Sequence, residues 1–467
     1  MQTDASLHTI QTNLFHGLLD YTKSFPDFSI PQRFLMVSPK EAKEVLEKIE
    51  TSLKDEKEIL VYIHLPFCSS ECAFCNAFPQ NSSRDIQEKY VSRLLDEIDI
   101  YSSARLFNGK SVKCLYLGGG TPTSFSSSEI DRIIQKLRSV VRFSEKCSIT
   151  CEAHIKDLLG NDRIGELAQL GINRISIGCQ TFDTKVLELC KRFHRASQVK
   201  EAVRNIKQLG LSTNIDMMLG LPGQSLEGVR RDLDLLADIE PDSIEYMRHE
   251  IVNPLVISLF RQNPGLLVEN DELFRMTYQM QEWMEEQGYE QNGSFSSDER
   301  FPYRYHWLKE MPFISLGSRS RSYTKDICFD KHEALSLYFR LIEKGVAPIA
   351  RYMVLNKKEQ MHRSLFLNLQ VRDGLDTRSF ETRFGEDALV EFSALLDRLD
   401  KCGCIEVDDS SIRLSRYGRY FVEDVSCFII DQAIQCGEYG EQIKRMPHSS
   451  GALSERLSSR QKISESE

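Results

Sequence analysis

The sequence lacks three features that would place the protein in a membrane, outside the cell or on a nucleic acid. No apolar run among its 467 residues is long enough to cross a bilayer. Its start has no basic segment followed by an apolar one, so no secretory signal is expected. Its 59 Lys and Arg are outnumbered by 69 Asp and Glu, and this net charge of −10 disfavours non-specific nucleic-acid binding. We therefore expect a cytoplasmic protein that binds neither membrane nor nucleic acid.

The sequence also lacks the even set of cysteines that is typical of a disulfide framework. It has 13 cysteines, an odd number in a long chain, and most of them are expected to be reduced. Several lie in apolar, strand-like runs, where a free cysteine acts as a small hydrophobe: Cys114, Cys147, Cys151 and Cys179. Three closely spaced cysteines, Cys68, Cys72 and Cys75, do not fit that explanation.

The middle of the chain alternates between short apolar runs and longer stretches with helical periodicity. The predicted strands are Ile59–Leu65, Val112–Leu117, Cys147–Ala153, Asn173–Gly178, Ser212–Leu219 and Ser243–Met247. The predicted helices are Ile86–Ser102, Ser128–Val140, Asp162–Leu170, Gln198–Leu209 and Leu226–Ile239. Repeated strand–helix units form parallel sheets, and about six units are too few for a closed eight-fold barrel. The sequence therefore predicts an α/β protein built on a partial (β/α)6 barrel.

Further segments flank the predicted barrel. Residues 1–57 are expected to form an N-terminal arm or cap, 58–290 the barrel, and 291–360 a barrel extension and connecting segment. Residues 361–430 combine helical stretches with a predicted hairpin, which is typical of a winged-helix-like domain. Residues 431–467 form a tail that is Ser- and charge-rich, and disorder is expected from about residue 444.

The three cysteines follow the first predicted strand at the spacing Cys68-x3-Cys72-x2-Cys75. Iron–sulfur clusters are held by thiolates, and three thiolates from one short loop can bind three irons of a cubane. The fourth iron is then open for chemistry, as catalytic metal sites generally are. The spacing predicts a [4Fe–4S] cluster whose open iron binds S-adenosylmethionine (SAM) and cleaves it reductively to a 5′-deoxyadenosyl radical. The alternative is a zinc site with His64 as fourth ligand, although zinc sites usually pair two separated half-sites.

Glycines and polar residues gather at the C-terminal ends of later predicted strands. Gly118-Gly119-Gly120-Thr121 follows the second strand, where glycine permits close approach to a ligand or simply forms a tight turn. Glu152 ends the third strand, Gln180 ends the fourth, and Asp216 lies in the fifth. These ends share one face of a parallel barrel, where ligands bind. Each residue alone suits a cap, but together they predict a ring of hydrogen-bonding groups around one mouth.

Four segments carry a resemblance to a known family: Tyr62-x-His64-x-Pro66-Phe67-Cys68, Gly118–Thr123, Ser176–Phe182 and Asn214–Gln224. Together they resemble the oxygen-independent coproporphyrinogen III oxidase superfamily of radical SAM enzymes. This superfamily comprises the oxidase, radical SAM heme chaperones, anaerobic heme-degrading enzymes and class C radical SAM methyltransferases. The similarity runs from about Tyr21 to about Phe428.

The resemblance implies room for two SAM molecules, with Cys68, Cys72, Cys75, Gln180 and Asp216 carrying the chemistry. Tyr62, Gly119 and Glu152 would contact the molecule on the cluster. The residues that would contact the second molecule are Phe74, Gly120, Thr121, Gln180, Arg192 and Asp216. Arg321 would bind a cofactor carboxylate or an anionic substrate, or would be a surface charge. Phe74 and Arg192 also have plain interpretations, as loop packing and as a solvated charge.

Three departures from the family pattern bear on the branch, and one of them is the pair Arg319 and Arg321 in the family's small-residue loop, here Leu316–Tyr323. Ala77 stands where the oxidase has a fourth cysteine, and Tyr303–Trp307 lacks the His-Asn pair of the heme chaperones. The Cys75-Asn76-x-Phe78 signature is more similar to the class C methyltransferases. We therefore expect methyl or methylene transfer to an sp2 carbon of an aromatic or heteroaromatic small molecule. The enzyme is expected to be a monomer that receives electrons from a donor such as flavodoxin or ferredoxin.

Two alternatives stay open. The first is a tetrapyrrole enzyme, either an oxidative decarboxylase or a heme-ring-opening enzyme. The second is a heme chaperone with His306 or His249 as the iron ligand. Transcriptional regulation through the C-terminal module is disfavoured, because residues 363–428 mix acids and bases without a basic stripe. We expect that module to be a lid over the barrel mouth.

Overall fold

The structure, a computed structural model, describes residues 34–76, 83–159, 162–289, 302–422, 425–426 and 428–430, and the backbone of 291–292 and 295–296. Tyr21, Ala77, Phe78 and the tail from residue 431 therefore lie outside the described residues. The chain divides into two compact units. The larger comprises residues 31–356 and 370–372, and the smaller comprises 1–30, 357–369 and 373–467.

A 13-stranded sheet forms the centre of the larger unit, in the order β1-β13-β12-β11-β10-β2-β3-β4-β5-β6-β7-β9-β8. Its strands are β1 Leu35–Met36, β2 Glu58–Leu65, β3 Ser111–Gly119, β4 Arg142–Ala153, β5 Arg174–Gln180, β6 Ser212–Leu219, β7 Ser243–Arg248, β8 Gln291–Asn292, β9 Phe295–Ser296, β10 Phe313–Leu316, β11 Arg321–Tyr323, β12 Ile327–Lys331 and β13 Ile349–Val354. Strands β2 to β7 and β10 pair in parallel, and antiparallel strands extend both edges. The sheet is thus open, which confirms the predicted partial barrel, and all six predicted strands are confirmed.

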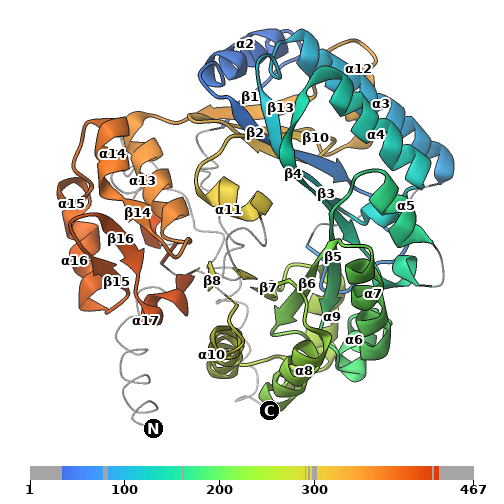
Figure 1. Cartoon of the computed structure of the whole chain (residues 1–467), viewed down its shortest axis with the longest axis vertical. Helices are drawn as coiled ribbons and strands as arrows, with labels where there is room; N and C mark the ends of the chain where they lie inside the picture. Colours follow the sequence, from blue (N-terminus) through green and yellow to red (C-terminus); the bar gives the residue numbers. More distant parts are fainter. Residues whose placement is uncertain are drawn as a thin grey trace, which may run out of the picture. The chain divides into compact units, whose positions relative to one another are not determined.

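Helices cover the outer face of this sheet, as Figure 1 shows for α3 and α4 beside β2 to β4. The helices are α2 Ala42–Ser52, α3 Arg84–Ser103, α4 Ser127–Val140, α5 Arg163–Gln169, α6 Thr184–Leu189, α7 Ala196–Gln208, α8 Leu226–Ile239, α9 Pro254–Gln262, α10 Asn270–Glu286, α11 Pro302–Leu308 and α12 Leu335–Ile342. The five predicted helices are confirmed, whereas α6 was missed because its six residues are too few to show a period. Helix α2 lies in the segment expected to form an arm, and packs Val45 and Ile49 into the core.

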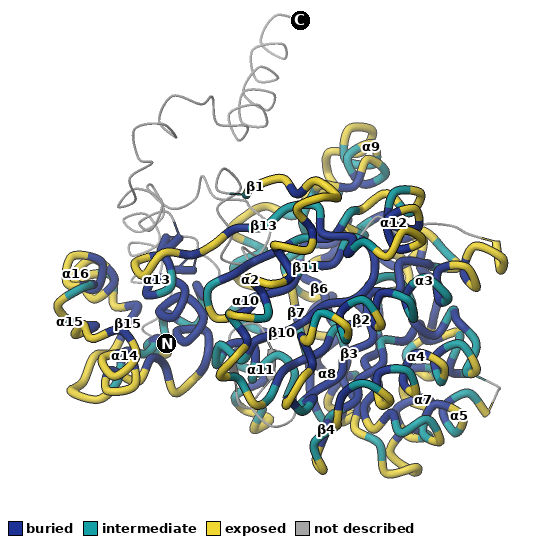
Figure 2. The backbone as a smooth tube through the Cα atoms, turned by 90° about the horizontal axis from the view of Figure 1, so that it is seen from above, coloured by how far each residue is buried: buried dark blue, intermediate teal, exposed yellow. Residues whose placement is uncertain are grey.

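Successive side chains along each parallel strand point alternately into the core and toward the face that carries the site. In β2, Ile59, Val61 and Ile63 pack under the outer helices in the main hydrophobic core. Because successive side chains point to opposite faces, Tyr62 and His64 lie on the other, concave face. The strands are mostly buried in Figure 2, and the outer helices expose one side to solvent. The concave face is therefore where a ligand can meet several strands at once.

N-terminal caps define where the helices that follow two of the strand-end loops begin. Helix α4 begins at Ser126 with a capping box, in which the Ser126 hydroxyl accepts from the Glu129 amide and the Glu129 carboxylate accepts from the Ser126 amide. The Ser225 hydroxyl caps α8 by accepting from the Gly228 amide at 3.1 Å. These caps set where each strand-end loop stops.

The smaller unit contains a three-stranded sheet in the order β14-β16-β15. Its elements are α13 Lys357–Asn368, β14 Leu375–Asp376, α14 Thr377–Phe384, α15 Ala388–Glu391, α16 Ser393–Lys401, β15 Ile405–Val407, β16 Ser411–Leu414 and α17 Arg416–Arg419. Phe380 packs against Phe384 and Phe392 with ring centroids 4.7 and 5.6 Å apart. This helical unit with a β-hairpin confirms the predicted winged-helix-like domain.

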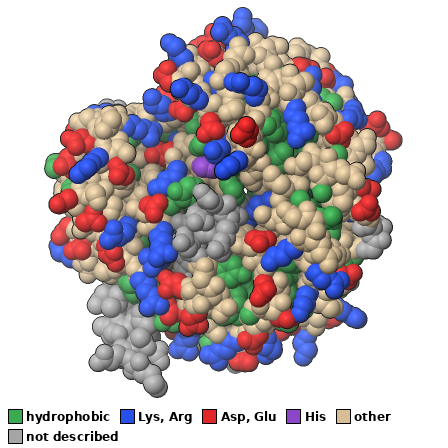
Figure 3. Space-filling model, viewed as in Figure 1, with side chains coloured by type: hydrophobic (Ala, Val, Ile, Leu, Met, Phe, Trp, Pro, Cys, Tyr) green, Lys and Arg blue, Asp and Glu red, His purple; other side chains and the backbone are tan. Residues whose placement is uncertain are grey.

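The surface matches the mixed charge of the sequence. Figure 3 shows basic and acidic side chains interspersed over the face that it presents. Within the described residues, no helix combines the length and the apolar character needed to span a bilayer.

Candidate functional site

The loop that follows β2 holds the three spaced cysteines, and all three are free thiols. Phe67 anchors the start of this loop, because its buried ring packs against Tyr90 and Phe125 with centroids 5.4 and 5.7 Å away. A turn closes between Cys75 and Cys72, where the Cys75 amide donates to the Cys72 carbonyl at 3.2 Å. The loop is thus tied at its root and turned back on itself at the C-terminal end of β2.

Two of the thiols have polar neighbours from other strand ends. The Cys68 thiol lies 3.1 Å from the Thr121 hydroxyl, and an Arg192 guanidinium nitrogen lies 3.5 Å from the Cys72 sulfur. Burial raises the pKa of the Cys68 thiol to about 11, so its thiolate form requires a positive partner such as iron. Across the described residues, no three His, Cys, Asp or Glu side chains are grouped to hold one metal ion. Three thiols from one short loop match the ligand type of an iron–sulfur cluster, in which each thiolate would bind a different iron.

The glycines after β3 are required by the chain itself. A Cβ on Gly119 would lie 2.5 Å from the His64 ring, and Gly119 has a φ of +112°. A Cβ on Gly120 would lie 2.7 Å from the Phe67 carbonyl oxygen. The Gly120 amide donates to Leu65 at 2.8 Å and the Thr121 amide donates to Phe67 at 2.9 Å. The glycines therefore let the β3 end lie directly against the cysteine loop, and place Thr121 beside Cys68.

Arg192 is buried, which corrects its plain interpretation as a solvated charge. It follows α6, and its guanidinium donates to the Gly178 carbonyl as well as lying beside Cys72. Phe74, between two of the cysteines, packs against a small cluster that includes Cys190 and Met218. Both residues thus join the cysteine loop to the ends of β5 and β6.

The concave face carries a row of carboxyl groups that face one another. Glu152 lies level with Ser176 on the neighbouring strand, and the Ser176 hydroxyl donates to Asp216 at 3.1 Å. The Gly119 amide donates to Glu152 at 3.1 Å. Burial, opposed by hydrogen bonds from Tyr116 and Gly119, raises the pKa of Glu152 from its usual 4.5 to about 7. The sequence therefore correctly placed Glu152 and Asp216 on one face.

Gln180 closes β5 in a conformation unusual for its type. Its φ of 76° is in the left-handed region, and its side chain is only 9% exposed. The side-chain oxygen Oε1 of Gln180 is buried and has no hydrogen-bond partner among the described residues. A buried acceptor without a partner at a strand end indicates a group held ready for a ligand donor.

Tyr62 belongs to an aromatic group on the concave face. Its hydroxyl lies 3.2 Å from the His64 Nδ1, and its ring stacks on Tyr116 at 6.0 Å. Tyr303 of α11 packs on the same rings, 4.9 Å from Tyr116 and 6.5 Å from Tyr62. Burial raises the pKa of Tyr62 well above its usual value, so its hydroxyl stays protonated. Sequence reasoning missed Tyr116 and Tyr303, although Tyr303 lies in the segment that was noted for lacking a His-Asn pair.

Arg321 has an acidic partner from the adjacent strand. Its guanidinium forms a two-point ion pair with Asp330 on β12, and Arg351 on β13 binds the same carboxylate at 2.7 Å. Its guanidinium also lies over the Phe34 ring, 5.4 Å from the centroid. The structure thus provides Arg321 with a structural role in joining β11, β12 and β13.

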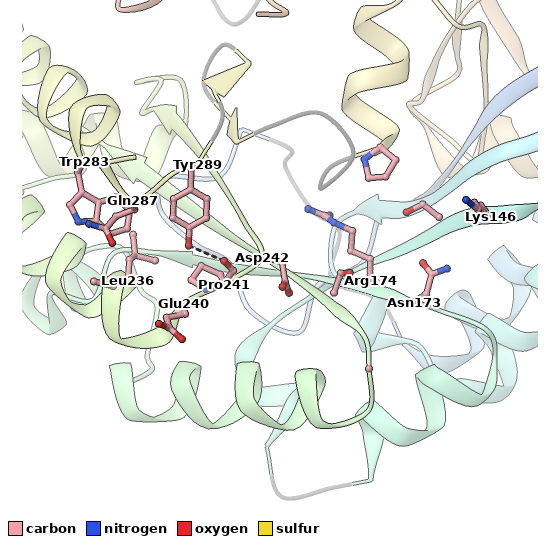
Figure 4. Close-up of a pocket in the computed structure, with 15 residues that line it drawn as sticks. Lys146, Asn173, Arg174, Leu236, Glu240, Pro241, Asp242, Trp283, Gln287 and Tyr289 are labelled. Atoms are coloured by element: carbon pink, nitrogen blue, oxygen red, sulfur yellow. Dashed lines mark hydrogen bonds between the residues drawn. The ribbon is translucent and has the colours of Figure 1, made fainter. Parts of the chain in front are cut away.

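A separate cavity of about 740 Å³ opens at the other end of the strands. Its lining comes from the N-terminal ends of β4 to β6, the loop between α8 and β7, and the end of α10 (Figure 4). None of the residues predicted for the site lines it, but Arg174, which the sequence reasoning also missed, does. The Tyr289 hydroxyl in its wall donates to Pro241 at 2.8 Å. The Asn173 side chain in this wall accepts a hydrogen bond from the Ile149 amide at 2.8 Å and donates one to the Cys147 carbonyl at 2.9 Å.

Comparison with known proteins identifies the class of protein to which this fold and site belong. Residues 62–236 match the Radical SAM superfamily, and residues 355–421 match the HemN C-terminal domain. The chain is therefore a radical SAM enzyme, whose cofactors are a [4Fe–4S] cluster and SAM.

Its relatives define the family within that class. The oxygen-independent coproporphyrinogen III oxidase of Helicobacter pylori strain J99 is 24% identical over 396 residues, 80% of this chain and 86% of that protein. The heme chaperone HemW of Escherichia coli K12 is 30% identical over 233 residues, 50% of this chain and 60% of that protein. The solved structure of coproporphyrinogen III oxidase (HemN) from Escherichia coli superposes with a TM-score of 0.76 at 22% identity, covering 89% of this chain and 98% of that one. The chain belongs to the oxygen-independent coproporphyrinogen III oxidase-like superfamily.

These relatives bear on the choice between the methyltransferase interpretation and the tetrapyrrole-enzyme alternative. The expected class C methyltransferase activity finds no support among them, because they are an oxidase and a heme chaperone. The Cys75-Asn76-x-Phe78 signature that favoured methyl transfer ends at Phe78, outside the described residues. The alternative of a tetrapyrrole enzyme fits the comparisons better.

Proposed function

We propose that this radical SAM enzyme oxidises a tetrapyrrole, in the manner of an oxygen-independent coproporphyrinogen III oxidase. The observation that carries the proposal is the length of the similarity. The alignment with the oxidase spans 396 residues, far beyond the radical SAM segment, whereas the alignments with heme chaperones span 225 to 342 residues. The alignment with the oxidase covers 80% of this chain, against 70% for the longest of these chaperone alignments, so the similarity to the oxidase extends further beyond the shared catalytic domain.

In this proposal Cys68, Cys72 and Cys75 hold the cluster. Arg192 beside Cys72 supplies positive charge that favours a thiolate, and Thr121 gives Cys68 a hydrogen-bond partner. The cluster, when bound, supplies the electron that cleaves SAM to a 5′-deoxyadenosyl radical. A donor such as flavodoxin or ferredoxin would provide that electron.

The strand ends would bind and orient SAM and the substrate. Tyr62 lies within β2, Gly119 and Glu152 lie at the ends of β3 and β4, and the Gly119 amide already donates to Glu152. Gln180 offers its unpaired oxygen to a ligand donor such as an amine or hydroxyl. Phe74, Gly120, Thr121, Arg192 and Asp216 complete this set. Arg321 is left out, because Asp330 already binds its guanidinium at two points.

The concave face also offers a surface for a flat aromatic substrate. Tyr62 and Tyr116 are stacked with an interplanar angle of 21°, and Tyr303 tilts against both. Aromatic surfaces of this kind favour planar or pyrrolic ligands by offset stacking and edge contacts. Their position on the same face as Glu152 would bring such a substrate to the SAM site.

The test is anaerobic incubation of the reconstituted enzyme with reductant, coproporphyrinogen III and methyl-labelled SAM. The proposal predicts 5′-deoxyadenosine together with a decarboxylated porphyrinogen of lower mass. The Asp216→Asn variant should lose turnover while it keeps its iron content. Unchanged coproporphyrinogen III would contradict the proposal, and transfer of the methyl label with release of S-adenosylhomocysteine would revive the methyltransferase interpretation.

One observation favours heme binding as a second candidate function. His249 directly follows β7, and its Nδ1 lies 3.2 Å from the Gly220 carbonyl. Its Nε2 is buried and has no hydrogen-bond partner within the part of the chain that the structure describes. Burial lowers the pKa of this imidazole to about 4, so the ring is neutral and able to bind a metal. Heme titration should then give stoichiometric binding that is lost in His249→Ala and kept in His306→Ala. Wild-type protein that binds no heme would exclude this function.

A further inference from the structure

Asp216 has a second carboxyl group beside it that the sequence reasoning did not assign. In the parallel pairing of β6 and β7, Asp216 lies directly level with Glu245. Neighbouring strands are about 4.8 Å apart, and residues that lie level share a face. Both side chains therefore lie on the concave face, next to each other, at the level of Gly178 in β5.

Two carboxylates this close in a poorly hydrated site repel each other strongly, unless a cation or a proton lies between them. The described charged or titratable groups that act on one or both members of the pair come from several neighbouring elements: Glu152 of β4, Arg174 of β5, Tyr116 of β3 and Arg304 of α11. Arg174 is deeply buried and donates to the Ser243 hydroxyl two residues before Glu245. Its guanidinium thus lies nearer the strand N-termini than the two carboxyl groups do.

The described neighbours distinguish the two carboxyl groups. Asp216 accepts its hydrogen bonds from neutral donors, since Ser176 and the Asn214 amide both donate to its Oδ1, and the positive charge that acts on it comes from Arg174. Glu245 has the two arginines as its charged neighbours, and each favours its ionised form. Burial and then the nearby Glu245 raise the pKa of Asp216 well above its usual value. A proton shared by the pair is therefore expected to reside on Asp216.

We propose that Glu245 is a positioning residue that shares one proton with Asp216, and so presents Asp216 to the ligand as a hydrogen-bond donor. The assignment rests on the proposed function only in taking Asp216 to face a ligand. A protonated Asp216 offers an O–H to an acceptor oxygen, such as a carboxylate or hydroxyl oxygen of the ligand. An ionised Asp216 would instead favour an ammonium group. Glu245 would thus select the kind of ligand group that binds above β6.

The test measures the protonated carboxyl band of Asp216 in the infrared spectrum of the anaerobic, reconstituted enzyme, titrated from about pH 4 to about pH 9. Subtracting the spectrum of Asp216→Asn isolates Asp216 from Glu152 and other buried acids. In the Glu245→Gln background, the Glu245→Gln/Asp216→Asn double variant serves for the same subtraction. The midpoint of the Asp216 band should fall by at least about one pH unit in Glu245→Gln, because the neighbouring charge is gone.

Two further variants keep the result interpretable. Glu227→Gln, on the exposed surface of α8, should leave the midpoint unchanged. Glu245→Asp keeps the negative charge but moves it away from Asp216, so the midpoint of the Asp216 band should fall by less than in Glu245→Gln. This variant also provides the test if Glu245→Gln fails to fold. An unchanged midpoint in the Glu245 variants, or an Asp216 already ionised at neutral pH in the wild type, would overturn the inference. Because no substrate is used, failure here is distinct from failure of the proposed tetrapyrrole activity.

Discussion

Two buried ionic groups in the larger unit differ in their balance of charge. In one, Lys331 binds Glu97, and both side chains are fully buried. The Lys331 ammonium also donates to the Ser315 carbonyl, and Glu97 accepts from the Gly317 amide at 2.8 Å and the Tyr338 hydroxyl at 2.7 Å. In this group one positive charge is balanced by one negative charge, and both charged side chains form additional hydrogen bonds with the protein.

The other group, on the concave face, has three carboxyl groups. These are Glu152, Asp216 and Glu245. Arg174 acts on Asp216 and Glu245, and Arg304 adds positive charge near Glu245. Burial raises the pKa of all three acids. Elsewhere in the sheet, by contrast, the single carboxylate of Asp330 forms ion pairs with both Arg321 and Arg351.

The comparison separates a structural ion pair from a binding site. The Glu97 group holds the Gly317 loop against β2, because Tyr90 donates to the His64 carbonyl and accepts from the Ser318 amide in the same place. It needs nothing further. The concave-face group leaves acid in excess and an unpaired Gln180 oxygen beside it, which costs stability in the free protein and is typical of sites that bind or transform a ligand.

The largest effect is expected from Lys331→Met. This change leaves the Glu97 carboxylate buried without its cation, and the free energy of unfolding should fall by about 3–5 kcal/mol. Chemical denaturation of the variant and the wild type measures the difference. A loss below about 1 kcal/mol would mean that the pair is not structural.

Tyr338→Phe should have a smaller effect of the same sign. It removes one hydrogen bond to Glu97 and keeps the ring, which stacks on Tyr90 at 5.6 Å. A hydrogen bond to a charged group contributes about 1.5–3 kcal/mol. The same denaturation measurement applies. If Tyr338→Phe lost as much unfolding free energy as Lys331→Met, the ion pair with Lys331 would not be the main interaction that stabilises the buried Glu97 carboxylate.

Glu152→Gln should instead stabilise the protein, and only as pH rises. The folded pKa of Glu152, about 7, is above its usual 4.5, so the folded state binds more protons between these values and wild-type stability falls as pH rises through them. The variant has no such group, and its advantage should grow from about pH 4.5 to reach about 3 kcal/mol above pH 7. Urea denaturation at several pH values measures this difference, and a constant difference would show that Glu152 titrates normally.

The smallest effect is expected from Lys136→Met, which breaks the surface pair with Asp99. Asp99 is 56% exposed, so water replaces the lost partner, and the change should cost less than about 1 kcal/mol. This variant is the matched control for Lys331→Met. A cost near that of the buried pair would remove the distinction between the two environments.

Much of the fold could be predicted from the sequence because its strands are buried β-branched runs followed by periodic helices. The cysteine spacing and the acids at strand ends were visible for the same reason. The Glu97–Lys331 pair was not, because its members are 234 residues apart. Glu245 is one acid in a short strand, and its place beside Asp216 follows only from the register of β6 against β7. Arg192 looked like a surface charge until the loop after α6 was seen to bury it against Cys72.

The most direct test of the central claim is the anaerobic yield of 5′-deoxyadenosine from SAM in two cysteine variants. Cys190 is the matched control, because it is buried beside the same loop and its carbonyl accepts from the Ala73 amide at 3.0 Å. If Cys68, Cys72 and Cys75 hold the cluster, Cys72→Ala should abolish formation of 5′-deoxyadenosine, and Cys190→Ala should retain it. Undiminished formation in Cys72→Ala would contradict the account.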